Sequence, residues 1–293
     1  MSKPHIVGLT VDSDIEDPDE LWRAAFSAQV KAKRGEKRNS QRIEIPDAKP
    51  FALALLSDIH IGSASTDYRQ AKADAEIVRD TPGMYAGYHG DGVDNWILSK
   101  LAGLQRNQAL TFDSEIQLFG AWLNLLKGKL LFAVSGNHDN WTHILSGFDR
   151  IRGALRGTQC LYDQHEVTFD LGWNRQQWKI KARHSFSHRS IFNVTHGLEV
   201  NWERGGTDFD IVVGGHTHVG ALCRPFYRQG KKRFACLTGT YKVDDEFGRK
   251  IGAAPSRDRG CGALVFSQDG IFWTENLGIA SQFLGYLRGK RSK

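Results

Sequence analysis

Apolar runs that end in short polar segments recur along this 293-residue chain. Continuous runs of about five or six apolar residues, bounded by Gly and polar residues, are typical of buried strands. Such runs predict strands at 51–56, 130–134 and 209–213, and a weaker run, interrupted by His89, predicts another at 84–88. In an open α/β sheet, functional groups gather beyond the carboxyl ends of the strands. The polar segments that follow these strands should therefore meet on one rim.

The other periodic segments predict helices and hairpins. Apolar residues at helical spacing favour helices over 17–33, 68–80 and 113–126. Alternating segments joined by short turns favour hairpins within 167–183 and 263–274. The chain is long enough to build one large core. We therefore expect an α/β fold with three parts. These are an N-terminal helical and basic arm at 1–50, one domain at 51–285, and a basic tail at 286–293.

Four polar fragments follow the predicted strands and carry the chemistry. They are Asp58-Ile59-His60, Gly90-Asp91-Gly92-Val93-Asp94-Asn95, Gly136-Asn137-His138-Asp139 and Gly215-His216-Thr217-His218. Together they supply carboxylate, imidazole and amide groups, a mixture that suits Mn, Fe or Zn better than Ca. Two such metals about 3.5–4 Å apart are a device for hydrolysing phosphate esters.

The spacing within the fragments suits shared ligands. Asp58 and His60 are two residues apart, so in an extended segment both would point toward one metal. The same spacing separates His216 and His218. A carboxylate has two oxygens, so Asp91 can bridge two cations.

The four fragments, in this order, resemble the calcineurin-like metallophosphoesterase superfamily over residues 51–241. The resemblance implies a two-sheet mixed β-sandwich flanked by helices, the four-layer αββα metallophosphoesterase fold. It implies one metal held by Asp58, His60, Asp91 and His218, and a second held by Asp91, Asn137, His216 and a further histidine. It also implies that His138 is the catalytic histidine, oriented by Asp139. The segment 183–197 loosely resembles stretches of phage- and prophage-encoded phosphoesterases.

Three histidines compete for the remaining ligand position. His184 ends an alternating run at 178–183 and so lies at the carboxyl end of a predicted strand, like the other ligands. His188 and His196 remain alternatives, and Thr195-His196-Gly197 also resembles a ligand context. Strand position favours His184.

The resemblance predicts a metal-dependent phosphoric ester hydrolase. A metal-activated hydroxide would attack phosphorus, and His138 could protonate the leaving oxygen. Asp94 is a candidate for a hydrogen bond to a ligand histidine. His89 and His196 are candidates for a supporting role or for substrate contact. The expected cofactors are two divalent ions, Mn first, with Fe, Zn or Ni as alternatives.

Net charge gives the only clue to the substrate. The charge is +6, which attracts polyanions. A phosphoesterase or phosphodiesterase acting on a phosphate ester, such as a nucleotide, is the first hypothesis. A DNA or RNA nuclease using the basic surface is the second, and a catalytically disabled nucleic-acid-binding protein is the third. The sequence leaves oligomeric state open.

Targeting features are absent from the sequence pattern. No apolar run approaches the ~20 residues needed to span a bilayer, and no apolar signal segment follows Met1. The four cysteines show no CxxC spacing and are expected to be reduced. These features predict a cytoplasmic protein without a membrane partner.

Overall fold

The computed structural model describes residues 18–35, 41–97, 108–188, 190, 192–204, 208–243 and 260–289. The chain divides into two units, residues 1–41 and 42–293. The described part of the first unit is mainly helix α1 (Pro18–Gly35), which confirms the helix predicted there. Trp22, Phe26 and Val30 follow one another at four-residue spacing on α1, and all three are exposed.

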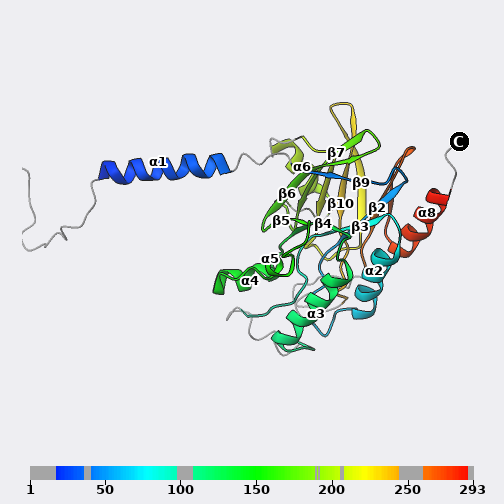
Figure 1. Cartoon of the computed structure of the whole chain (residues 1–293), viewed down its shortest axis with the longest axis horizontal. Coiled ribbons are helices and arrows are strands. Elements are labelled where there is room, and N and C mark those ends of the chain that lie inside the picture. Colours follow the sequence, from blue (N-terminus) through cyan, green and yellow to red (C-terminus); the bar gives the residue numbers. More distant parts are fainter. Residues whose placement is uncertain are drawn as a thin grey trace, which may run out of the picture. The chain divides into compact units, whose positions relative to one another are not determined.

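The second unit contains two mixed sheets of six strands each (Figure 1). One sheet has the order β12-β11-β2-β3-β4-β5 and the other has the order β1-β6-β7-β8-β10-β9. The strands are β1 (Gln41–Glu44), β2 (Phe51–Leu56), β3 (Met84–Tyr88), β4 (Leu130–Val134), β5 (Leu161–Asp163), β6 (Glu166–Trp173), β7 (Gln176–Arg183), β8 (Ile211–Gly214), β9 (Leu222–Arg228), β10 (Lys231–Leu237), β11 (Ala263–Ser267) and β12 (Gly270–Thr274). The predicted α/β sandwich of two sheets is confirmed.

Strand β2 shows how the sequence builds the layers. Alternate side chains of a strand point to opposite faces. Phe51, Leu53 and Leu55 therefore join the core between the two sheets, where they meet residues such as Phe132 and Phe169. Ala52, Ala54 and Leu56 point the other way, into the core that the helices cover. All six β2 residues are buried, which explains the uninterrupted apolar run.

Helices cover both outer faces of the sandwich (Figure 1). The helices are α2 (Tyr68–Asp80), α3 (Phe112–Leu125), α4 (Asn137–Ser146), α5 (Arg150–Ala154), α6 (His196–Arg204) and α8 (Leu277–Gly289). Apolar stripes of α2, α3 and α8 pack on the first sheet, and α6 packs on the second through Leu198. The result is the expected order of four layers: helices, sheet, sheet, helix.

Parallel pairing brings together the strand ends that the polar fragments follow. Strands β2, β3 and β4 are mutually parallel neighbours in the first sheet. Strands β7, β8 and β10 are parallel neighbours in the second. The carboxyl ends of each trio therefore lie on one edge of their sheet, and both edges carry polar fragments.

Some boundaries differ from the expected ones. Strand β1 precedes residue 51 yet pairs with β6, so the body begins before the expected boundary. Helix α8 continues to Gly289, past the expected start of the tail at 286, because Leu277, Ala280 and Leu284 bury one side of it. Strand β8 begins at Ile211 rather than at residue 209. Within the described residues, no helix is long and apolar enough to cross a membrane.

Glu115 is a buried acidic residue on α3, with 3 % of its surface exposed. Burial raises the pKa of Glu115 to about 7, although the backbone N–H of Asn95 donates to its carboxylate at 3.3 Å. An unfolded glutamate titrates near pH 4.3. The folded protein therefore binds the proton of Glu115 more tightly than the unfolded chain does. The contribution of this proton to the free energy of unfolding is present at low pH and is lost as pH rises through about 7.

We therefore expect Glu115→Gln to remove this pH-dependent loss. The free energy of unfolding of the variant, relative to the wild type, should increase between about pH 5 and about pH 8. Urea denaturation of both proteins in the same chelator-containing buffers measures this difference. A difference that stays constant with pH would contradict the assignment.

Candidate metal centre

The fragments at the strand ends adopt left-handed backbone conformations at the key side chains. Positive φ values occur at Asp58 (50°), His60 (54°), Asp91 (53°), His216 (70°) and His218 (51°). This conformation costs roughly 1–2 kcal/mol per non-glycine residue, and such strain clusters at functional sites. The sequence suggested that residues two apart point toward one metal because the segment is extended. In the structure, each pair instead consists of two residues in left-handed conformation that flank a single intervening residue.

Backbone hydrogen bonds hold these strained turns together. The Asp58 N–H donates to the Gly90 carbonyl at 2.9 Å, and the His60 N–H donates to the Asp91 carbonyl at 3.0 Å. Gly136 lies so close to Asp91 that a Cβ atom there would be 2.0 Å from Asp91 Oδ1. A glycine at this position therefore lets the third fragment pack directly on the second.

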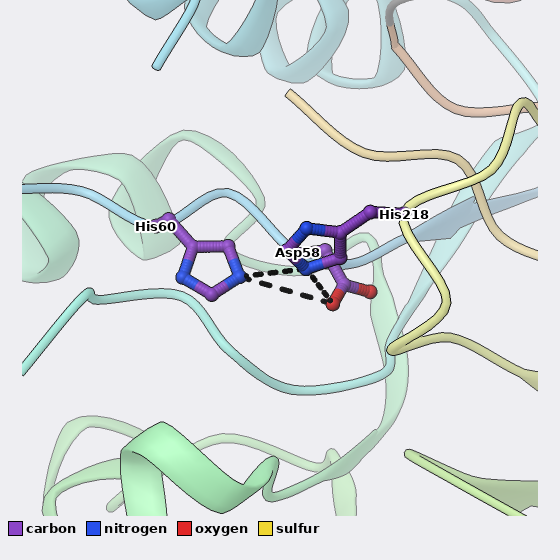
Figure 2. A group of neighbouring side chains, drawn as sticks. All are labelled: Asp58, His60 and His218. Atoms are coloured by element: carbon purple, nitrogen blue, oxygen red, sulfur yellow. Dashed lines mark hydrogen bonds and ion pairs between the residues drawn. The ribbon is translucent and has the colours of Figure 1, made fainter. Parts of the chain in front are cut away.

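The first cluster contains Asp58, His60 and His218 (Figure 2). His218 Nε2 lies 3.1 Å from Asp58 Oδ1 and 3.0 Å from His60 Nε2. One ligand atom from each residue lies within 4.8 Å of the others. Asp58 and His60 are buried, whereas His218 is partly exposed. The three side chains could hold one metal ion that solvent can reach from the His218 side.

The second cluster contains Asp91, His184 and His216. His184 Nε2 lies 3.1 Å from Asp91 Oδ2 and 3.0 Å from His216 Nδ1. Asn137 Oδ1 approaches the same nitrogen at 3.2 Å. His184 is therefore the histidine that joins the expected ligands, as strand position favoured. His188 is exposed and His196 begins α6.

Asp91 lies between the two clusters. Its Oδ2 atom is 3.1 Å from His184 Nε2 in the second cluster and 4.0 Å from His60 Nε2 in the first. Its Oδ1 atom accepts a hydrogen bond from the backbone N–H of His138 at 2.9 Å. Despite burial, the charge of His184 holds the pKa of Asp91 well below its usual range. The carboxylate is thus ionised and placed to contact both clusters.

The donor atoms of the second cluster fit a bound cation. His184 Nδ1 faces the His89 carbonyl oxygen at 2.7 Å, and a carbonyl can only accept, so Nδ1 carries the hydrogen. In the neutral ring, Nε2 then presents a lone pair to Asp91 Oδ2 and Asn137 Oδ1, which are also acceptors. Burial would lower the pKa of His184, but the Asp91 carboxylate raises it to about 10. Either a proton or a metal ion must satisfy these converging acceptors.

Asp94 and Lys242 support the first cluster. Asp94 Oδ1 lies 2.9 Å from His60 Nδ1 and accepts a hydrogen bond from Lys242 Nζ at 2.9 Å. Burial and the Lys242 ammonium lower the pKa of His60 to about 4, against the effect of the Asp94 hydrogen bond. His60 is thus a neutral imidazole whose Nδ1–H donates to Asp94, which leaves Nε2 free to bind a metal. The sequence made Asp94 a candidate for a hydrogen bond to a ligand histidine, and the histidine that it contacts is His60.

His138, Asp94 and His60 form a third group of possible donors. It shares His60 with the first cluster, and the Asp94 carboxylate already accepts hydrogen bonds from Lys242 and from Gln108 Nε2 at 2.7 Å. His138 Nδ1 faces the backbone carbonyl of Asp94. We therefore interpret this group as a hydrogen-bonded network and not as a separate metal position.

Asp139 has a different role from the one expected. Its Oδ2 atom accepts hydrogen bonds from the backbone N–H groups of Asp91 (2.8 Å) and Gly136 (3.0 Å) and from the Tyr88 hydroxyl (3.0 Å). The carbonyl of Asp94, and not the carboxylate of Asp139, is the hydrogen-bond partner of the His138 ring. Asp139 therefore fixes the backbone under Asp91 instead of orienting His138.

The remaining sequence candidates lie outside the clusters. The ring of His89 packs edge-on against Phe132 at 5.1 Å, and only the His89 backbone reaches His184. His196 is half-buried at the start of α6. The sequence reasoning missed three contacts: Lys242 on Asp94, Trp96 Nε1 on Asp94, and Ser57 Oγ on Asp58 at 2.5 Å. Ser57 and Trp96 adjoin the motifs, but nothing in the sequence marked Lys242.

Comparison with known proteins gives distant similarities of fold. No protein-family model matches the sequence, and no curated protein matches it. Vps29 from Chaetomium thermophilum is 11% identical, with 76% of this chain and 96% of that chain covered and a TM-score of 0.39. Calcineurin-like phosphoesterase YfkN from Bacillus subtilis is 12% identical, with 82% and 99% covered and a TM-score of 0.38. At this distance, the chemistry must be judged from the residues of the site.

Those residues and their layers resemble one known class of proteins. The four fragments, in order and at the strand ends of a two-sheet α/β sandwich, resemble the calcineurin-like metallophosphoesterases. The Asp and His clusters are groups that could hold divalent metal ions.

Proposed function

We propose that this protein is a phosphodiesterase that uses two divalent metal ions. The observation that carries the proposal is the pair of donor clusters on either side of Asp91. One ion would be held by Asp58, His60, Asp91 and His218, and the other by Asp91, Asn137, His184 and His216. When bound, such ions lower the pKa of water and stabilise charge on phosphoryl oxygens.

His138 is placed to serve as the proton donor. Because its Nδ1 donates to the Asp94 carbonyl, Nε2 is the nitrogen that can exchange a proton with substrate. Among the described residues, none hydrogen-bonds to Nε2. His138 also lies beside the first cluster, since its ring centre is 4.7 Å from that of His60. Donation to the leaving oxygen is therefore the role that this geometry supports.

The mixed donor set guides the choice of metal. Four imidazoles, two carboxylates and one amide suit first-row transition metals better than Ca or Mg. We propose Mn as the first metal to test, with Fe, Zn and Ni as alternatives.

One exposed basic segment gives the nuclease alternative no support. Lys231 and Lys232 are exposed at the start of β10, next to the turn that follows β9. Strand β10 runs parallel to β8, whose carboxyl end leads to His216, so the basic turn lies at the opposite edge of the sheet. A seven-residue strand spans roughly 20 Å. This basic turn is thus remote from the clusters, and the assay decides between substrates.

An activity assay with defined metal content tests the proposal. The protein is stripped with chelator, reloaded with Mn²⁺, Fe²⁺, Zn²⁺ or Ni²⁺, and given bis-p-nitrophenyl phosphate, cyclic nucleotides, and single- and double-stranded DNA. We expect metal-dependent turnover of small diesters. His165→Ala, at an exposed position before β6, serves as a control that keeps full activity. Cleavage of DNA alone would support the nuclease, and no turnover with two bound metals would support a disabled binding protein.

A further inference from the structure

An aromatic group surrounds the ring of His138. The ring centre of Trp141 lies 4.1 Å from that of His138 with an interplanar angle of 32°, and the ring centre of Trp96 lies at 4.8 Å. The two indoles also contact each other at 5.3 Å. Trp96 is buried, whereas Trp141 is half-buried. Trp141 is therefore the more exposed indole beside the proposed proton donor.

The helix α4 explains why Trp141 lies there. Asn137 and His138 begin this helix directly after β4, and Trp141 follows His138 by three residues. Side chains three or four residues apart on a helix are neighbours on one face. The strand end that positions the metal-binding Asn137 thus also fixes Trp141 against His138.

Exposed apolar residues follow Trp141 in the sequence. Ile144 and Leu145 lie three and four residues further along α4, and Phe148 comes just after the end of the helix; their side chains are 72%, 60% and 55% exposed. Leaving such groups in water is unfavourable, so exposed apolar groups favour apolar ligands. The Lys242 ammonium donates to Asp94 and packs over the Trp96 ring at 5.5 Å. The surface beyond His138 therefore offers apolar contact.

The proton transfer in the proposed function places one half of the substrate on this surface. If His138 Nε2 protonates the leaving oxygen, the group attached to that oxygen must pass beside the His138 ring. Of the two indoles beside that ring, Trp141 is the more exposed. A flat aromatic ring of the substrate can stack on an indole, and such stacking favours binding.

We propose that Trp141 is a specificity-determining residue that binds an aromatic ring on the leaving group of the substrate. The ring is that of a nucleobase or an aryl group, which share this chemistry. The proposal rests on the proposed function for the direction of the substrate, and it adds to that function a preference for diesters whose leaving group carries such a ring.

Binding of two non-hydrolysable phosphonates tests the proposal without turnover. The Mn-loaded wild type is titrated with methylphosphonate and with phenylphosphonate in a calorimeter. We expect phenylphosphonate to bind about tenfold more tightly. Trp141→Ala should reduce this preference to within about twofold, and Trp141→Phe should retain most of it. Phe192→Ala is the matched control, because Phe192 is 99% exposed on the loop after β7, and the preference should persist in it.

Kinetics with an aryl diester provides the second measurement. Trp141→Ala should raise KM for bis-p-nitrophenyl phosphate about tenfold, because stacking helps to hold the substrate. Substituting thymidine and adenosine esters for the aryl diester distinguishes a nucleobase from an aryl group as the preferred ring.

The outcomes separate this inference from the proposed function. Equal affinity of the wild type for the two phosphonates, or a preference that survives Trp141→Ala, would overturn the aromatic subsite. Hydrolysis of diesters with an unchanged preference in Trp141→Ala would leave the hydrolase standing and remove the subsite. A phenyl preference that Trp141→Ala abolishes, without any turnover, would retain the subsite and remove the hydrolase.

Discussion

Asp91→Ala is expected to abolish hydrolysis and to weaken both metal positions together. The Oδ2 atom of Asp91 lies near His184 Nε2 on one side and His60 Nε2 on the other, at 3.1 and 4.0 Å. A single carboxylate oxygen of Asp91 therefore lies within 4.0 Å of a histidine nitrogen in each cluster. If the bound metals stabilise the transition state by several kcal/mol, their loss lowers kcat/KM on the order of 10³-fold or more.

The Asp91 prediction is checked by kinetics together with metal analysis. Asp91→Asn keeps the shape of the side chain but loses its charge, so it should also lose metal, although the fold remains. Asp269→Asn is the matched control, because Asp269 lies exposed in the turn between β11 and β12. Full metal content and activity in Asp91→Asn would show that the carboxylate does not join the two positions.

His138→Gln is expected to separate catalysis from metal binding. His138 belongs to neither proposed ligand set, and its ring is held by the Asp94 carbonyl and by aromatic contacts. Removal of a proton donor typically costs 10²–10⁴-fold in rate. The value of kcat should therefore fall by about that factor while two metals remain bound.

Leaving-group dependence sharpens the His138 prediction. A substrate whose leaving oxygen needs no proton, such as a p-nitrophenyl ester, should lose less activity in His138→Gln than an alkyl ester does. His165→Gln serves as the control for a histidine outside the clusters. An equal loss on both esters, accompanied by loss of metal, would make His138 a structural or ligand residue instead of the proton donor.

The sequence predicted the parts of the fold that depend on local pattern. Strand β2 is buried on both faces, so its six residues form an uninterrupted apolar run that is easily recognised. Helix α2 begins where Asp67 accepts a hydrogen bond from the backbone N–H of Gln70, a short-range capping signal. Strand β9 was not predicted, because it lies at the exposed edge of its sheet and mixes polar and apolar residues without clear alternation. Strand β10 was not predicted either, because its first half, which begins with the exposed Lys231 and Lys232, is basic.

The candidate site also has features that the local sequence predicts and features that it does not. The proposed ligands follow strand ends, so the positions of Asp58, Asp91 and His184 could be expected from the strands alone. The left-handed turns could not be expected, because hydrogen bonds between distant segments hold them, such as the one from the Asp58 N–H to the Gly90 carbonyl. Lys242 and Asp139 act through contacts that span 148 and 48 residues of sequence, which no local pattern encodes.

The central claim is that Asp91 joins two metal ions, and anomalous diffraction from Mn-loaded crystals tests it most directly. The account predicts two anomalous peaks about 3.5–4 Å apart, with the Asp91 carboxylate between them. One peak would lie beside His60 and His218, and the other beside His184 and His216. A single peak, or peaks remote from Asp91, would contradict the account.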